Sequence, residues 1–298
     1  MAEKFNNTIE YINPAFENTE RQKRFLEKYR QREIMAFGEG FLEYIDISPE
    51  KTSGKDIFVA VGTPSNWEQM EEFVFCLVDA GHRVTALKHP DLSLKASLKY
   101  DPKKQRPLAI QAFFKEKHLT DQTVIAHSFG LIDVVNSGPE GVGRLVAINP
   151  AGLNRNNPVL HSLNAVSGIK LAFSPGAGNE EEKAAYQKLV KDLFRQTPLK
   201  SFKEVVAAGK ADLRKDLSEN FSQIPIVIVQ NDDDSFIKPG KTHKDLEGAG
   251  MSFKRLEGGG NHLGPFIHGD QADEIVKVID GLERIEKNKE EQDRYIFK

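Results

Sequence analysis

Thr123-Val-Ile-Ala-His-Ser-Phe-Gly130 is the stretch of sequence that decides the fold. The apolar run 124–126 predicts a short buried strand, which stops abruptly at a histidine and a serine. Apolar residues recur at helical spacing over 129–136 and predict a helix. We therefore expect Ser128 to lie at a sharp corner between a strand and a helix.

The small residues around Ser128 have a steric reason. Ala126 and Gly130 lie two positions before and after it, where larger side chains would collide at so tight a corner. This pattern is typical of a nucleophile elbow, which holds a serine in a strained conformation with its hydroxyl projecting from the sheet. The backbone N–H of Phe129 would then face negative charge developing on a substrate oxygen. The alternative is an ordinary strand followed by a capping serine, so the motif needs support from the rest of the chain.

Composition limits the classes of function. The 298 residues can form one large domain or a domain with a substantial insertion, and the net charge of -3 gives no electrostatic reason to expect a nucleic-acid partner. The single cysteine, Cys76, excludes an intramolecular disulfide, and we expect its side chain to lie in the core. We expect the protein to bind no metal and no cofactor. No apolar run is long enough for a membrane span, and residues 1–7 do not resemble a signal peptide, so we expect a cytoplasmic protein.

Strand and helix patterns alternate along most of the chain. Strands are expected at 40–47, 57–61, 82–87, 123–126, 144–148, 224–229 and 252–256. Helices are expected at 19–37, 67–80, 107–117, 129–136, 180–194, 201–217, 241–248 and 270–290. This alternation predicts an α/β fold with a mostly parallel central sheet and helices on both faces.

The same patterns divide the chain into three parts. Residues 40–152 and 223–298 are expected to form the α/β core, and 1–39 a helical N-terminal extension. Residues 153–222 contain no convincing strand and are predicted to be a helical insertion between two strands of the sheet.

Three loops carry residue types that suit nucleophilic catalysis. Ser128, the acidic cluster 232–234 and His262 each follow a predicted strand, so they should meet at the carboxyl edge of the sheet. The order serine, acid, histidine closely resembles the α/β-hydrolase superfamily, in its lidded lipase and esterase branch, over residues 40–285. Further support comes from Val61-Gly-Thr-Pro64, Ile148-Asn-Pro-Ala-Gly152 and Gly260-Asn-His262. The resemblance implies an α/β-hydrolase fold in which 153–222 is a helical lid.

The resemblance also implies a Ser-His-Asp triad. Ser128 would be the nucleophile, His262 the base that takes its proton, and Asp234 the acid that orients the imidazole. Asp233 is an alternative acid, because the family's proline more often stands four residues after the acid, whereas Pro239 stands five residues after Asp234. His268 is an alternative base, and His127 is expected to pack rather than react.

The same family likeness implies an oxyanion hole formed by the backbone N–H groups of Thr63 and Phe129. The family usually has histidine before the glycine at position 62, whereas this chain has Val61. Asn66 and Trp67 would lie close enough to line the pocket, although Trp67 could equally belong to the core.

Two functions remain open at this point. The first is a serine hydrolase that cleaves an ester, thioester or amide of a small-to-medium acyl group. Its substrate would be a small molecule and its intermediate an acyl-enzyme. Perhydrolysis and carbon–carbon bond cleavage, which use the same triad in this family, are alternative reactions. The second is a non-catalytic binding or interaction protein on the same scaffold. The sequence does not indicate the oligomeric state.

Overall fold

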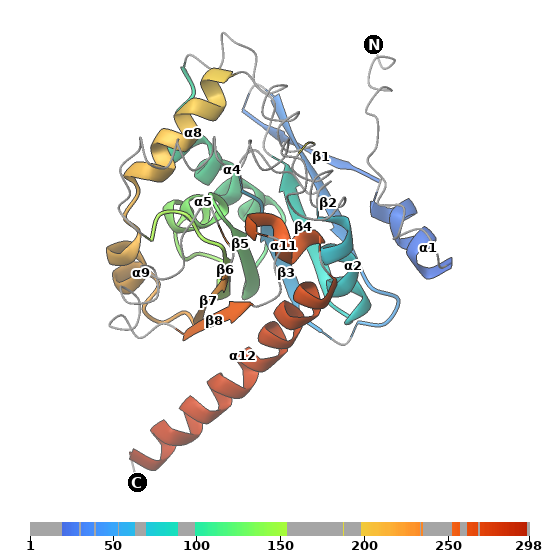
Figure 1. Cartoon of the computed structure of the whole chain (residues 1–298), viewed down its shortest axis with the longest axis vertical. Coiled ribbons are helices and arrows are strands. Elements are labelled where there is room, and N and C mark those ends of the chain that lie inside the picture. The colour runs from blue at the N-terminus through green and yellow to red at the C-terminus, as the bar shows by residue number, and fades with distance from the viewer. Residues whose placement is uncertain are drawn as a thin grey trace.

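The computed structural model describes residues 20–29, 31–38, 40–52, 54–62, 70–88, 99–153, 187, 198–232, 234, 252–256, 261–267 and 269–296. Within these residues, eight strands form one sheet in the order β1-β2-β4-β3-β5-β6-β7-β8 (Figure 1). The strands are β1 (Glu33–Phe37), β2 (Gly40–Ile47), β3 (Asp56–Ala60), β4 (Arg83–Lys88), β5 (Gln122–His127), β6 (Val142–Ile148), β7 (Ile226–Asn231) and β8 (Ser252–Leu256). The helices are α1 (Glu20–Tyr29), α2 (Glu71–Asp79), α4 (Pro102–Glu116), α5 (Gly130–Ser137), α8 (Pro198–Lys210), α9 (Arg214–Asn220), α11 (Gly264–Ile267) and α12 (Gly269–Ile296), with a 3-10 turn at Asn261–Leu263.

The sheet is mixed but mostly parallel, as the sequence predicts. Strands β4, β3, β5, β6, β7 and β8 pair in parallel, whereas β1 and β2 pair antiparallel with each other and β2 pairs antiparallel with β4. Because the parallel strands run in the same direction, their carboxyl ends and the loops that follow lie along one edge of the sheet.

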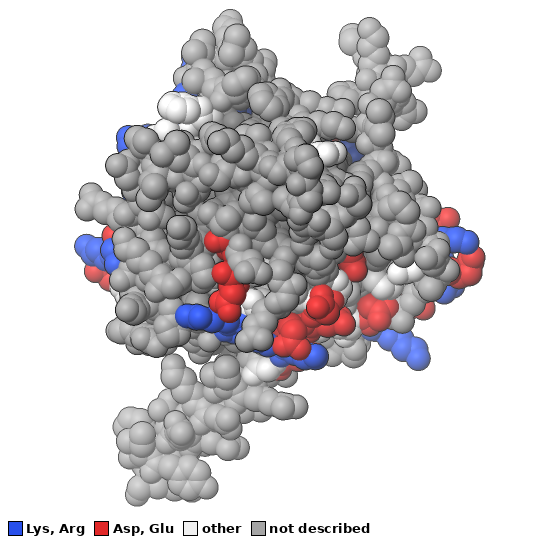
Figure 2. Space-filling model, in the orientation of Figure 1, with Lys and Arg blue, Asp and Glu red and all other residues white. Residues whose placement is uncertain are grey.

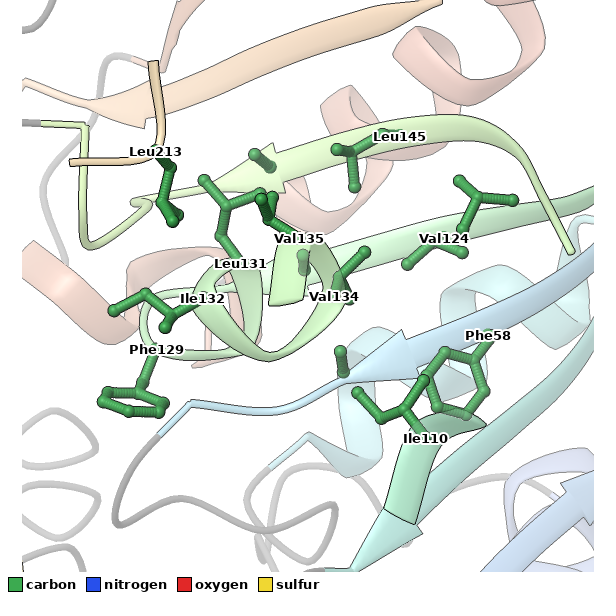
Figure 3. Packing of buried hydrophobic residues seen from close by; sticks show 14 of the residues in the cluster. Phe58, Ile110, Val124, Phe129, Leu131, Ile132, Val134, Val135, Leu145 and Leu213 are labelled. Atoms are coloured by element: carbon green, nitrogen blue, oxygen red, sulfur yellow. The ribbon is translucent and has the colours of Figure 1, made fainter. Parts of the chain in front are cut away.

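Two hydrophobic layers cover the two faces of the sheet. One joins α1, α2, α11 and α12 to strand residues such as Ile125, and the other joins α4, α5, α8 and α9 to residues such as Val124 and Ala126 (Figure 1). Successive residues of β5 thus face opposite layers, as the alternation of a strand requires. Figure 3 shows the second layer, where Leu131 and Val134 of α5 pack over the sheet. The central strands are apolar because both faces are covered.

The N-terminal segment differs from its predicted form. A single helix was expected over 19–37, but α1 ends at Tyr29 and Glu33–Phe37 forms strand β1. This part of the prediction was wrong because Met35 is buried and the strand pairs with β2 across a turn at Gly38, which has φ +57°. The apolar face of the helix was predicted correctly, since Phe25, Leu26 and Tyr29 are all buried in the core.

Helices α8 and α9 lie in the expected insertion 153–222, where one helix was predicted over 201–217. Helix predictions over 180–194 and 241–248 lie outside the described residues, except for the helical residue Gln187. None of the described helices is both long and apolar enough to cross a membrane. On the face drawn in Figure 2, the described acidic and basic side chains lie close to one another.

Candidate active site

Ser128 occupies the corner between β5 and α5. Its φ of +51° places a residue other than glycine in the left-handed region, which costs about 1 kcal/mol and persists only where the surroundings enforce it. Here Ser128 N–H donates to the Ile148 carbonyl at 3.0 Å, and its own carbonyl accepts from the N–H of Ala151 at 3.0 Å. These bonds to the end of β6 hold Ser128 in the strained conformation expected of a nucleophile elbow.

Two glycines allow the corner to approach the end of β3. A methyl group on Gly130 would overlap the carbonyl oxygen of Ala60, and one on Gly62 would lie 2.8 Å from Cβ of Ser128. The steric explanation for a small residue at position 130 is therefore correct. The segment after β3 and the start of α5 are in direct contact, beside the candidate nucleophile.

Phe129 is the N-cap residue of α5. Its N–H belongs to the first turn, where the helix offers no acceptor for backbone donors. Thr63, the other expected donor, lies outside the described residues, as do Asn66 and Trp67.

Asp234 and His262 form a buried pair although 28 residues separate them in the chain. Asp234 follows β7, and His262 lies in the 3-10 turn after β8. Nδ1 of His262 donates to Oδ2 of Asp234 at 2.8 Å, and the two residues are 8% and 2% exposed. Because Nδ1 is engaged by the carboxylate, Nε2 is the ring nitrogen that can exchange a proton. The alternatives Asp233 and His268 lie outside the described residues.

Asn149 connects the loops that carry this pair. Its side-chain Nδ2 donates to the backbone carbonyl of His262 at 2.9 Å, and its Oδ1 accepts from the N–H of Asn231 at 2.8 Å. Asn149 is fully buried and has φ +43°, which asparagine tolerates better than most residues. The sequence shows Asn149 only as the end of a strand; the tolerance of asparagine for left-handed conformations was the one available signal of a special turn.

His127 packs under the same loop, in agreement with its predicted role. Its Nε2 donates to the His262 carbonyl at 3.3 Å, and its ring lies 4.8 Å from the ring of His262 and 4.5 Å from that of Phe266. Burial lowers the pKa of His127 well below its usual range, and the nearby His262 lowers it further. His127 is therefore uncharged, and it fills the space between the serine corner and the histidine loop.

His127, the neighbour of Ser128 in the chain, connects the serine corner to the backbone of His262. No group of three or more His, Cys, Asp or Glu side chains that could ligate a metal occurs among the described residues. Cys76 lies partly buried on α2, and burial raises its pKa to about 12.

Sequence comparisons find no match for the chain, either among protein-family models or among curated proteins. Solved structures do match. A bromoperoxidase from Bacillus anthracis superposes with a TM-score of 0.66 at 18% identity, covering 84% of this chain and 99% of that one. An esterase from Exiguobacterium antarcticum gives 0.66 at 13% identity, covering 84% of this chain and 100% of the other.

A carboxylesterase of the thaumarchaeon Nitrososphaera gargenis gives a TM-score of 0.64 at 12% identity, covering 86% of this chain and 100% of that one. All three matches span most of both chains. With the sheet order and the serine corner described above, they establish that this chain has the α/β-hydrolase fold.

Proposed function

We propose that the protein is a serine hydrolase that cleaves an ester, or a thioester or amide, of a small-to-medium acyl group. The single observation that carries the proposal is the buried 2.8 Å pair of His262 and Asp234, on the same sheet edge as the strained Ser128. A pair of this kind orients an imidazole toward a nucleophile and stabilises its protonated form. Solved structures of esterases with the same fold add support at the level of the fold.

In the proposed reaction, Oγ of Ser128 attacks the carbonyl carbon of the substrate and its proton passes to Nε2 of His262. The bond to the leaving group breaks as that group takes the proton from His262, which leaves an acyl-enzyme. Water then gives a proton to His262 and attacks the acyl carbon. The bond between that carbon and Oγ of Ser128 breaks as Oγ takes the proton from His262, which releases the acid and restores Ser128. Asp234 remains ionised and keeps the imidazole in the required tautomer.

The negative charge that forms on the carbonyl oxygen would be stabilised by the N–H groups of Phe129 and Thr63. Each such donor is worth a few kcal/mol in the transition state, so the position of these two backbone segments matters as much as the triad. Residues 153–222, which include α8 and α9, would form the lid that shapes the acyl pocket.

Labelling by a fluorophosphonate probe tests the proposal, together with turnover of nitrophenyl esters of increasing acyl length. Ser128→Ala should abolish both labelling and turnover. Ser137→Ala is the matched control, because Ser137 is a buried serine at the end of α5 whose hydroxyl donates to the Val134 carbonyl at 2.7 Å. His262→Ala should lose turnover as well.

A folded wild-type protein that is neither labelled nor active would contradict the proposal and favour a non-catalytic binding protein. Labelling that survives in Ser128→Ala would exclude Ser128 as the nucleophile. The ester panel would at the same time show the preferred acyl length.

A further inference from the structure

A buried cluster of charged residues lies beside the serine corner, and the proposed triad does not use it. Arg106 of α4 is 4% exposed, and Asp133 of α5 and Glu204 of α8 are 0% exposed. Nε of Arg106 donates to Oδ2 of Asp133 at 2.8 Å, and Nη1 donates to Oε1 of Glu204 at 3.1 Å. The hydroxyl of Tyr100 donates to the same glutamate oxygen at 2.6 Å.

Arg106 also contacts one residue in each of the two segments that are expected to form the oxyanion hole, the backbone of Val61 and the ring of Phe129. Its Nη2 donates to the carbonyl oxygen of Val61 at 3.1 Å, two residues before Thr63. The carbon of its guanidinium lies 4.7 Å from the ring centroid of Phe129, within the range of a cation–π interaction. One planar side chain therefore holds the end of β3 and the first residue after Ser128 at the same time.

Stability alone is a weak reason for such a cluster. Removing charges from water is costly, and a well-packed apolar set of similar volume often stabilises a fold equally well. The cost is visible at Asp133, where burial raises the pKa of the carboxyl group to about 7 although Arg106 acts to lower it. The fork of donors on Arg106 provides what an apolar side chain cannot, namely a fixed geometry between three separate segments.

We propose that Arg106 is a positioning residue for the hydrolysis: through Val61 and Phe129 it fixes the two backbone segments that stabilise the oxyanion, and through Glu204 it ties their position to α8. The inference rests on the proposed function and deepens it. Helix α8 lies in the segment 153–222 that we propose as the lid. Because Glu204 of this helix binds Arg106, a movement of α8 would shift Arg106 and with it the backbone of the oxyanion hole.

The test compares esters with thionoesters, in which sulfur replaces the carbonyl oxygen. Backbone N–H groups stabilise a developing oxyanion better than the larger and softer sulfur, so a well-formed oxyanion hole favours the oxygen ester. Arg106→Lys keeps the charge but loses the fork. It should lower kcat for the oxygen ester by about 10- to 100-fold, change KM by less than about 3-fold, and reduce the ratio of ester to thionoester turnover by about 10-fold.

Arg83→Lys is the matched control. Arg83 makes a similar fork, with Nε and Nη2 at 2.8 and 2.6 Å from the two oxygens of Asp46. It begins β4 and therefore lies at the opposite edge of the sheet. Its substitution should leave the ester to thionoester ratio unchanged, because a loss of folded protein lowers both rates equally.

An unchanged ratio in a folded Arg106→Lys variant would overturn the positioning role while leaving the proposed hydrolase intact. If Arg106→Lys does not fold, Glu204→Gln, which keeps the shape of the side chain, should show a smaller fall in the same ratio; no fall would overturn the proposal. A wild-type protein without turnover that depends on Ser128 would overturn the proposed function, and the positioning role with it.

Discussion

Replacing Asn149 with alanine should lower the free energy of unfolding by about 2–4 kcal/mol. The substitution removes the bonds of 2.9 Å to the His262 carbonyl and of 2.8 Å to the Asn231 N–H. Each buried hydrogen bond contributes about 1 kcal/mol net, and a buried donor left without a partner costs roughly 1–3 kcal/mol more. The carbonyl of His262 keeps its bond from His127, so the larger penalty falls on Asn231.

Urea unfolding followed by far-UV circular dichroism measures this loss. Asn149→Gly is the matched variant, because it removes the same two bonds but accepts the φ of +43° without strain. Both variants should be destabilised to a similar extent, since the strain in alanine is offset by the greater freedom of unfolded glycine. In the same variants kcat should fall by about 10-fold or more, because the histidine loop loses its main anchor.

Two results would refute the reasoning. A loss below about 1 kcal/mol in both variants would mean that the two bonds contribute little to stability. A large loss in Asn149→Ala with none in Asn149→Gly would identify backbone strain as the cause.

Asp234→Asn should preserve the fold and lower kcat roughly 10⁴-fold, as measured by ester turnover, because an amide disturbs the tautomer of His262; activity within 10-fold of wild type would exclude Asp234 as the triad acid. Gly130→Ala should destabilise the protein by about 1–3 kcal/mol or more in urea titration, because the added methyl group overlaps the backbone of β3. Gly281→Ala in α12 is the opposite case: the new methyl group enters open space, and the substitution should stabilise the protein by up to about 1 kcal/mol. His127 has a lowered pKa in the folded protein, so the unfolded chain binds the extra proton and stability should fall as the pH drops below about 6.5. His127→Gln should reduce this acid sensitivity in unfolding measured from pH 7 to pH 5, and an unchanged pH dependence would contradict it.

The sequence was most informative where period and chain direction determine structure. Strands 40–47 and 252–256 were predicted with their observed bounds, and the apolar runs around residues 57–61 and 123–126 became central strands. From parallel strands alone it followed that Ser128, the acid loop and His262 share one edge of the sheet.

Other features depend on tertiary contacts that no local pattern reports. Residues 33–37 became a strand because β2 offers them a partner, not because of their own composition. The contact of Asn149 with the His262 backbone and that of Arg106 with Val61 each join residues far apart in the chain, 113 and 45 positions respectively. Charged helix residues usually face water, so nothing in α4 distinguished Arg106 from its basic neighbours.

The main chain of the histidine loop is anchored independently of its imidazole, since Asn149 and His127 both donate to the carbonyl oxygen of His262. A His262→Ala protein should therefore keep the shape of the loop while losing the turnover that we propose. Mass spectrometry of small molecules that stay bound to this variant during purification from a cell extract would then identify candidate substrates without any prior choice of compound.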